Sequence, residues 1–333
     1  MNKRRLLIIA APVVLLIGVY FSGPRPSTPV FDKKLKTILA EPPALEGYIS
    51  LNESKHRIKP DNEARIVWAD SSKQKTEYAV VYLHGFSASQ MEGDPIHRRF
   101  AEQFGSNLFL ARLADHGIDT TEVLLQFTAD RFWESAKEAL AIGKAIGDKV
   151  ILISTSTGGT AALMLAAAYP DDVYALISMS PNIAINDPAA FLLNDPWGLQ
   201  IARMVIGGNY REWIASEQRA KYWNNKYRLE SLVQLEELVE SSMNEETFSK
   251  VKQPSLTLYY YKNEEEQDTE VKVSAMLEMN KLLGTPDSLK ITVAIPNSGA
   301  HVLGSPMVSK DVEGVYRNIE KFAMEKLHLK PVN

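Results

Sequence analysis

The chain has 333 residues, of which 45% are hydrophobic and 23% charged, and its net charge is −4. This composition is typical of a globular protein with one large domain or two smaller ones. The mild acidity argues against a nucleic-acid-binding protein, which needs a concentrated basic face. The absence of cysteine excludes disulfides, thiolate metal ligands and a cysteine nucleophile.

The N-terminus has the pattern of a membrane-targeting segment. The basic sequence NKRR precedes an uncharged apolar stretch at 6–21, and the Pro-rich stretch SGPRPSTP follows it. A basic lead before an apolar stretch is typical of a secretory signal or a signal anchor. Because prolines crowd the place where a cleavage site would lie, we predict an uncleaved transmembrane signal anchor at 1–23 and a linker at 24–45. A cleaved signal is the alternative.

The charges that flank this segment predict its orientation. Positive residues collect on the cytoplasmic side of membrane segments, so Lys3, Arg4 and Arg5 favour a cytoplasmic N-terminus. Basic residues beyond the apolar stretch weaken this preference. We therefore expect a membrane-anchored, single-pass protein with its main domain on the extracytoplasmic (periplasmic) side.

The rest of the chain, 46–333, alternates strand-like and helix-like segments. Several of the strand-like segments are apolar at consecutive positions, which is typical of strands buried on both faces of a parallel sheet. This alternation predicts an α/β domain with a mostly parallel central sheet flanked by helices, and its chemistry at the carboxyl ends of the strands. We expect strands at 65–69, 78–84, 107–113, 150–154, 173–180, 255–261 and 289–295, and helices at 95–104, 129–146, 159–168, 271–283 and 312–327.

One long interval breaks this rhythm. Between 180 and 253 no segment has a convincing strand pattern, and the interval contains three of the five tryptophans. Its three amphipathic stretches predict helices. We interpret 184–250 as a helical lid over the site, although its aromatic residues could simply pack it against the sheet domain. The three stretches read WGLQIARMVIGG, YREWIASEQRAKYWNN and LESLVQLEELVESSM.

The sequence KVILISTSTGGTAALMLAAAY is the clearest functional signal. A predicted strand stops at a cluster of small residues, and an apolar helix-like segment follows without a linker. A strand that turns directly into a helix can hold one side chain in an exposed, strained pose. Ser156 occupies this corner. We therefore interpret it as a nucleophile; the alternative is that these residues form only a polar turn. Ser154 replaces the first glycine of the usual G-x-S-x-G pattern but is small enough for the turn.

Two other loops carry residues that suit acyl-transfer chemistry. His84 and Gly85 follow the apolar run YAVVYL directly, and the glycine lets the next backbone N–H point into a site. His301 follows the last predicted strand, and a histidine there is a natural general base because imidazole titrates near neutrality. The other histidines have plainer interpretations. We expect His84 and His116 to shape loops through hydrogen bonds, and we expect three to lie at the surface: His56, His97 and His328.

Taken together, these motifs resemble the α/β-hydrolase family. The resemblance is carried by HGF at 84, RLADHG at 112, STSTGG at 154, SP at 180 and AHV at 300, and it extends from residue 78 to the C-terminus. Within the family, the chain is most similar to serine esterases and lipases such as monoacylglycerol lipases and bacterial carboxylesterases. The resemblance implies the α/β-hydrolase fold, Ser156 as nucleophile, His301 as base, and the backbone N–H groups of Phe86 and Thr157 as oxyanion donors.

The resemblance also implies an acid after the strand at 255–261. The sequence there is KNEEEQDTEVKV, and DTEVKVSAM resembles the family's acid followed by apolar residues that start a helix. We therefore predict Asp268, although it lies several residues further from the strand than the pattern requires. Glu264, Glu265 and Glu266 lie closer to the strand and remain alternatives.

These observations predict a serine hydrolase that cleaves carboxylic esters through an acyl-enzyme intermediate, and acyl esters are the expected substrates. We expect no cofactor and no metal, because the sequence has no H-E-x-x-H, calcium-loop, G-x-G-x-x-G or Walker motif. The expected partners are a small ester substrate and, through the N-terminal segment, a membrane. An amide or thioester hydrolase with the same triad is one alternative, and a catalytically silent binding protein is the other.

Overall fold

The computed structural model describes residues 15–38 and 40–332, and its centre is a seven-stranded sheet. The strand order is β1-β3-β2-β4-β5-β8-β9, in which β1 is antiparallel to β3 and all other neighbours are parallel. The predicted α/β class and all seven predicted strands are confirmed. The strands are β1 (Arg65–Val67), β2 (Thr76–Leu83), β3 (Asn107–Leu110), β4 (Gly147–Thr155), β5 (Val173–Met179), β8 (Ser255–Tyr259) and β9 (Lys290–Ala294).

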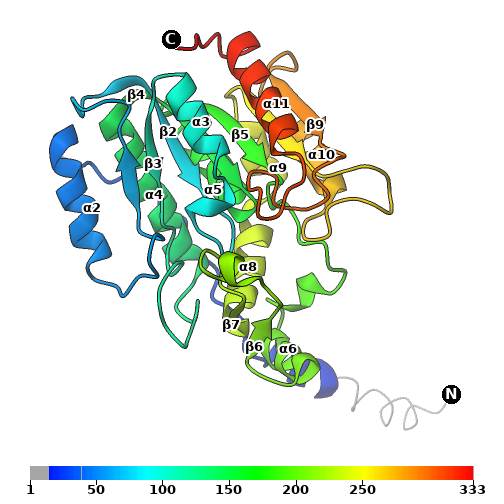
Figure 1. Ribbon diagram of the computed structural model, residues 1–333. Helices are drawn as coiled ribbons and strands as arrows, with labels where there is room; N and C mark the ends of the chain where they lie inside the picture. The colour runs from blue at the N-terminus through cyan, green and yellow to red at the C-terminus, as the bar shows by residue number, and fades with distance from the viewer. Residues whose placement is uncertain (1–14, 39, 333) are drawn as a thin grey trace, which may run out of the picture.

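Side chains of the central strands alternate between two apolar cores, one on each face of the sheet. In β2, for example, Val81 and Leu83 face one core, whereas Val80 and Tyr82 face the other. This two-sided burial is the reason why these strands are apolar at consecutive positions. The helices form a layer on each face (Figure 1). One layer contains α3 (Ile96–Gln103) and α11 (Val312–Glu325), and the other contains α2 (Leu45–Glu53), α4 (Ala129–Ile146), α5 (Thr157–Ala168) and α10 (Val273–Leu282).

Helix α2 was not predicted, and it begins where the predicted linker ends. It buries Leu45 and Ile49 in the core that also contains α4. Its last residue, Glu53, forms an ion pair with Arg112 at 2.7 Å. The first helix of the domain is therefore tied to the loop that follows β3.

The segment 184–250 contains a β-hairpin as well as helices. Strands β6 (Tyr210–Glu212) and β7 (Lys226–Arg228) pair antiparallel, and only the short α7 (Glu217–Ala220) between them is helical. The prediction of a helix over this stretch, without strands, was therefore wrong. The hairpin is closed by contacts between residues distant in sequence, such as Trp213 N–H to the Asn225 carbonyl at 2.9 Å, which local periodicity does not reveal. The other helices of the segment are α6 (Gly198–Ile206), α8 (Leu229–Ser242) and α9 (Glu245–Lys250).

Most of the predicted anchor, residues 1–14, lies outside the described residues. Residues 15–21 are helical and lie beside α6 (Figure 1). Within 15–38 and 40–332, no helix combines the length and apolar character needed to cross a bilayer.

Candidate active site

Ser156 lies at a sharp corner between β4 and α5. Its φ of 52° and ψ of −121° are strained values for a residue with a side chain. The two glycines that follow let the helix start this close to the sheet. A Cβ at Gly158 would lie 2.0 Å from the Leu83 carbonyl oxygen, and one at Gly159 would lie 2.5 Å from Pro181 Cβ. The glycines therefore fix the corner that holds the Ser156 side chain.

The serine at the first position of the motif fits this corner. Ser154 is fully buried, and its hydroxyl lies 3.2 Å from the hydroxyl of Ser178 on the neighbouring strand β5. Because its polar group has a partner, the substitution of serine for glycine leaves no unsatisfied hydroxyl in the core.

His301 and Asp268 form a hydrogen-bonded pair. The ring Nδ1 of His301 lies 2.7 Å from Oδ2 of Asp268, whose side chain is almost fully buried. The other carboxylate oxygen accepts the backbone N–H groups of Glu270 at 2.9 Å and Val271 at 3.1 Å. With both oxygens occupied, the carboxylate orients the imidazole so that Nε2 remains the nitrogen available for proton transfer.

The extra residues before Asp268 form a short loop, here called the excursion, whose two ends are hydrogen-bonded to each other. Tyr261 and Gln267 form a β-bridge, and the Asp268 N–H bonds the Tyr260 carbonyl at 3.1 Å, so the chain returns to the end of β8. The alternative acids Glu264, Glu265 and Glu266 lie exposed on this excursion. Glu264 accepts the Tyr261 hydroxyl and Glu266 pairs with Lys262. The carboxylate that the fold brings to His301 is thus Asp268.

Burial and pairing act in opposite directions on the His301–Asp268 pair. Burial alone would raise the pKa of Asp268, but the charge and hydrogen bond of His301, with two backbone N–H groups, hold this pKa below its ordinary value. Burial alone would lower the pKa of His301, but the Asp268 carboxylate outweighs this effect and raises it. The arrangement therefore stabilises an imidazolium beside a carboxylate, which is the charge state a general base reaches after accepting a proton.

The loop after β2 is held in place by two histidines. His84 is fully buried, accepts the Leu113 N–H at Nε2 (3.0 Å) and donates from Nδ1 to the Gly85 carbonyl (2.9 Å). His116 contacts the His84 ring and the Phe86 ring edge-on. Burial lowers the pKa of His84 well below its usual value and that of His116 to about 4, so both rings are neutral. The expectation that these two histidines shape loops is confirmed.

The predicted oxyanion donors come from the two segments next to Ser156, the loop after β2 and the first turn of α5. A Cβ at Gly85 would lie 2.9 Å from Ser156 Cβ, so the backbone that leads into Phe86 passes directly beside the serine. Thr157 is the first residue of α5, where N–H groups lack intrahelical partners. Within 15–38 and 40–332, neither the Phe86 N–H nor the Thr157 N–H donates a hydrogen bond.

The loop that carries His301 packs against the loop after β2. Val302 forms a small apolar cluster with Ala88 and Trp223, and a Cβ at Gly304 would lie 3.2 Å from the Glu92 carbonyl oxygen. In the described part of the chain, no hydrogen bond joins Ser156 to His301. Catalytic hydrogen bonds are often long before substrate binds, so the packing brings the two loops together without closing this contact.

Sequence analysis missed one residue of this site, Glu92. Its carboxylate is 3% exposed and accepts the Gly85 N–H at 2.5 Å. A Cβ at Gly85 would also lie 2.9 Å from Glu92 Oε1, so the carboxylate and Ser156 flank the same glycine. Burial raises the pKa of Glu92 to about 7, against the opposing effects of the Gly85 N–H and the charges of His301 and Arg219. Nothing local in the sequence QMEG indicates burial.

One prediction about the histidines was wrong. His97 is fully buried rather than at the surface, and its Nε2 lies 2.9 Å from the Gln90 carbonyl. It lies on the inner face of α3 against the Tyr82 ring, with centroids 4.6 Å apart. Its polar ring is tolerated there because the Gln90 carbonyl provides a hydrogen-bond partner. His56 and His328 are exposed, as predicted.

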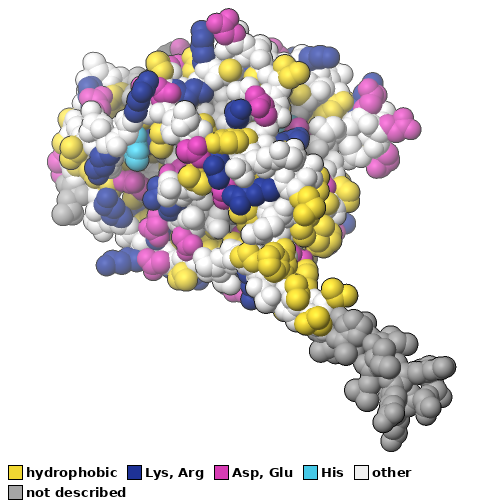
Figure 2. Space-filling model, turned by 90° about the horizontal axis from the view of Figure 1, so that it is seen from below, with side chains coloured by type: hydrophobic (Ala, Val, Ile, Leu, Met, Phe, Trp, Pro, Cys, Tyr) yellow, Lys and Arg dark blue, Asp and Glu magenta, His cyan; other side chains and the backbone are white. Residues whose placement is uncertain are grey.

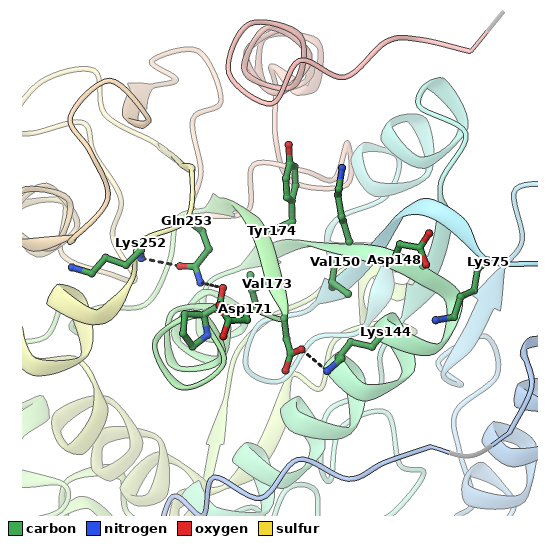
Figure 3. A pocket seen from close by; sticks show the side chains of 13 residues that line it. Lys75, Lys144, Asp148, Val150, Asp171, Val173, Tyr174, Lys252 and Gln253 are labelled. Carbon is green, nitrogen blue, oxygen red and sulfur yellow. Dashed lines mark hydrogen bonds and ion pairs between the residues drawn. The ribbon is translucent and has the colours of Figure 1, made fainter.

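A separate hollow lies at the opposite edge of the sheet. It has a volume of about 520 Å³ and is lined by residues at the starts of β4 and β5 (Figure 3). Lys144 pairs there with Asp172, and Lys149 pairs with Glu77, so two of its lysines form ion pairs. It shares no residue with the Ser156 site. Among the described residues, no cluster of histidine and acidic side chains could hold a metal ion.

Comparison with known proteins identifies the fold. No protein-family profile and no curated protein matches the sequence. A structure from work on LipS and LipT, two metagenome-derived lipolytic enzymes, is 16% identical, with a TM-score of 0.64 over 81% of this chain and 100% of the other. A monoacylglycerol lipase from Paleococcus ferrophilus is 14% identical, with a TM-score of 0.57 over 79% and 99%.

A thermophilic esterase from Thermogutta terrifontis is also similar, at 16% identity and a TM-score of 0.52 over 79% of this chain and 93% of the other. At such identities the likeness concerns the fold rather than the reaction. Together with the sheet order and the strand–serine–helix corner, it shows that the chain has the α/β-hydrolase fold.

Proposed function

We propose that this protein is a serine hydrolase that cleaves carboxylic esters through an acyl-enzyme intermediate. The observation that carries the proposal is the 2.7 Å bond between His301 and the buried Asp268. The His301 loop packs against the loop after β2, which passes beside the strained Ser156 corner. The similar structures from lipolytic enzymes, a monoacylglycerol lipase and esterases support the same class of reaction.

In the proposed mechanism, the Ser156 hydroxyl attacks the ester carbonyl while His301 Nε2 accepts its proton. The Phe86 and Thr157 N–H groups donate to the oxyanion of the tetrahedral intermediate. His301 then gives its proton to the departing alcohol, and a water attacks the acyl-enzyme in the second half-reaction. Asp268 stays ionised throughout, holds the imidazole tautomer and stabilises the imidazolium.

The test is labelling with a fluorophosphonate probe, which reacts only with an activated serine. We expect the folded protein to be labelled at Ser156 and to hydrolyse p-nitrophenyl esters. A folded protein that resists the probe would support the silent binding protein instead. Faster turnover of acyl-CoA or aminoacyl amides than of any ester would favour the thioester or amide alternative.

We also propose that residues 1–23 attach the protein to a membrane, with the hydrolase domain on the extracytoplasmic side. The support is the sequence pattern of a basic lead, an uncharged apolar stretch and prolines. We propose as a separate point that the segment 184–250 acts as a lid. It contacts two loops of the site: Asn224 N–H bonds the Ser87 carbonyl at 2.7 Å, and Trp223 packs against Val302. Protease protection of spheroplasts tests the orientation, and a domain shielded behind the inner membrane would contradict it.

A further inference from the structure

Helix α6 is amphipathic, but its apolar side faces outward. Ile201, Met204 and Val205 occupy positions i, i+3 and i+4, which form one stripe of a helix. In a soluble domain such a stripe is normally buried, yet here Met204 is 82% and Val205 79% exposed. The charged residue of the helix, Arg203, instead pairs with Glu230 of α8 at 2.6 Å. The helix therefore presents its apolar stripe to the surroundings.

Further exposed apolar side chains lie at the end of α6 and elsewhere in the segment 184–250. Ile214, in the loop after β6, is 100% exposed, and Phe191 and Ile206 are also exposed. Figure 2 shows hydrophobic side chains gathered on the underside of the molecule, next to the N-terminal segment. Exposed apolar patches of this kind mark binding surfaces in soluble domains. We refer to Phe191, Ile201, Met204, Val205, Ile206 and Ile214 as the apolar face.

The N-terminal helical turn lies directly against this region. Trp197 joins the two, because its indole N–H bonds the Val19 carbonyl at 3.0 Å and its backbone N–H bonds the Pro24 carbonyl at 3.0 Å. The Tyr20 hydroxyl also bonds the Asp195 carboxylate at 3.2 Å. The described residues 15–21 expose six large hydrophobic side chains, including Tyr20, and in the sequence they end the uncharged stretch 6–21.

We propose that the apolar face docks on a lipid bilayer, so that the domain lies on the membrane rather than hanging from a free tether. The choice of a bilayer as occupant rests on the proposed membrane attachment of residues 1–23. Although the face and the N-terminal segment are far apart in the sequence, Trp197 joins them in space, and the composition of that segment suits hydrocarbon. Trp197 and Tyr20 stand at the junction, and these two residue types are enriched at membrane–water interfaces.

This placement connects the bilayer to the Ser156 site through one segment. The same insertion that carries the apolar face outside contributes Trp223 and Tyr227 inside, where Trp223 packs against Val302 and Tyr227 against Phe86. A bilayer on the outer surface thus contacts the segment that covers the site.

The natural absence of cysteine makes a direct test available. Single cysteines are introduced in the full-length protein at Met204, Val205 and Ile214, labelled with an environment-sensitive fluorophore, and reconstituted into phosphatidylethanolamine–phosphatidylglycerol vesicles. Asp287→Cys is the matched control, because this side chain is 94% exposed in the turn before β9. Ile17→Cys reports separately on the N-terminal segment.

We expect probes at 204, 205 and 214 to shift to shorter emission wavelengths and to be quenched several-fold more strongly by doxyl lipids than the probe at 287. Quenching at 17 without quenching at 204, 205 and 214 would overturn docking while leaving the attachment intact. Failure at all positions, including 17, would overturn the attachment and the docking together. Protein-dependent self-quenching at 204 without lipid quenching would assign the face to a second copy of the chain and also refute the proposal. None of these readouts depends on hydrolysis.

Discussion

The carboxyl edge of the sheet and the outer surface of the insertion distribute polar and apolar groups in opposite ways. At the sheet edge, Asp268, Glu92 and His84 are buried, and each is hydrogen-bonded to backbone or to a neighbouring ring. On the insertion, Met204 and Ile214 are exposed. Removing one group from a buried polar network leaves its hydrogen-bond partners unsatisfied, which costs stability and activity. A substitution on an exposed apolar surface affects mainly the binding of whatever covers that surface. The two regions should therefore respond to substitution in different ways.

The largest expected effect is that of Ser156→Ala. If the sheet edge carries the chemistry, removal of the nucleophile should lower kcat on p-nitrophenyl esters by roughly a millionfold, as in related triads. Steady-state kinetics with purified protein measures this loss, and circular dichroism checks that the fold is retained. Substantial residual turnover would mean that another residue is the nucleophile. The sheet edge around Ser156 would then not be the catalytic region.

Asp268→Asn should have the next largest effect. The amide cannot stabilise the His301 imidazolium and favours the wrong tautomer, so we expect kcat to fall by roughly 10⁴-fold. Glu265→Gln is the matched control because Glu265 is exposed on the excursion before Asp268, and it should retain full activity. The reverse pattern would show that the acid is a residue of the glutamate run.

The two regions also differ in how far the sequence predicted them. The α4 bounds agree with the predicted 129–146, and the Ser156 corner lies where the small residues indicate, because two-sided burial and a tight turn leave local patterns. The β6–β7 hairpin depends on pairing between distant residues, and the burial of Glu92 and His97 depends on what packs over them. Periodicity carries neither kind of information. The outward stripe of α6 looked like an ordinary amphipathic helix for the same reason.

The double substitution Met204→Glu/Val205→Glu addresses the second region alone. Charges on the apolar face oppose its burial in a bilayer, so we expect hydrolysis of an ester embedded in vesicles to fall by about tenfold. Hydrolysis of soluble p-nitrophenyl acetate should stay unchanged, because neither residue contacts the Ser156 site. Met204→Leu/Val205→Leu is the apolar control. Equal losses on both substrates would mean that the two regions are not separable.

Glu92→Gln should have the smallest effect, seen in the pH profile rather than in the maximal rate. His301 acts as a base only when neutral, so activity falls as pH drops through its pKa, which Asp268 holds above the ordinary value with a further contribution from Glu92. Glutamine can still accept the Gly85 N–H but cannot ionise. Because the pKa of Glu92 is itself raised to about 7, only part of its charge is present on the acid limb. The acid limb of kcat/KM should therefore move slightly to lower pH while the plateau changes little.

Glu92→Ala removes both the charge and the acceptor of the Gly85 N–H. The loop that leads to Phe86 then lacks the hydrogen bond that holds it in place. Its plateau should therefore fall below that of the glutamine variant, by about tenfold to a hundredfold if the oxyanion donor is displaced. An unchanged acid limb in Glu92→Gln, with equal plateaus in both variants, would mean that Glu92 only fills space beneath the site. A shifted acid limb with a preserved plateau in Glu92→Gln would instead separate the effect of the Glu92 charge on His301 from its hydrogen bond to the Gly85 N–H. It would also show that a buried residue outside the triad tunes the base.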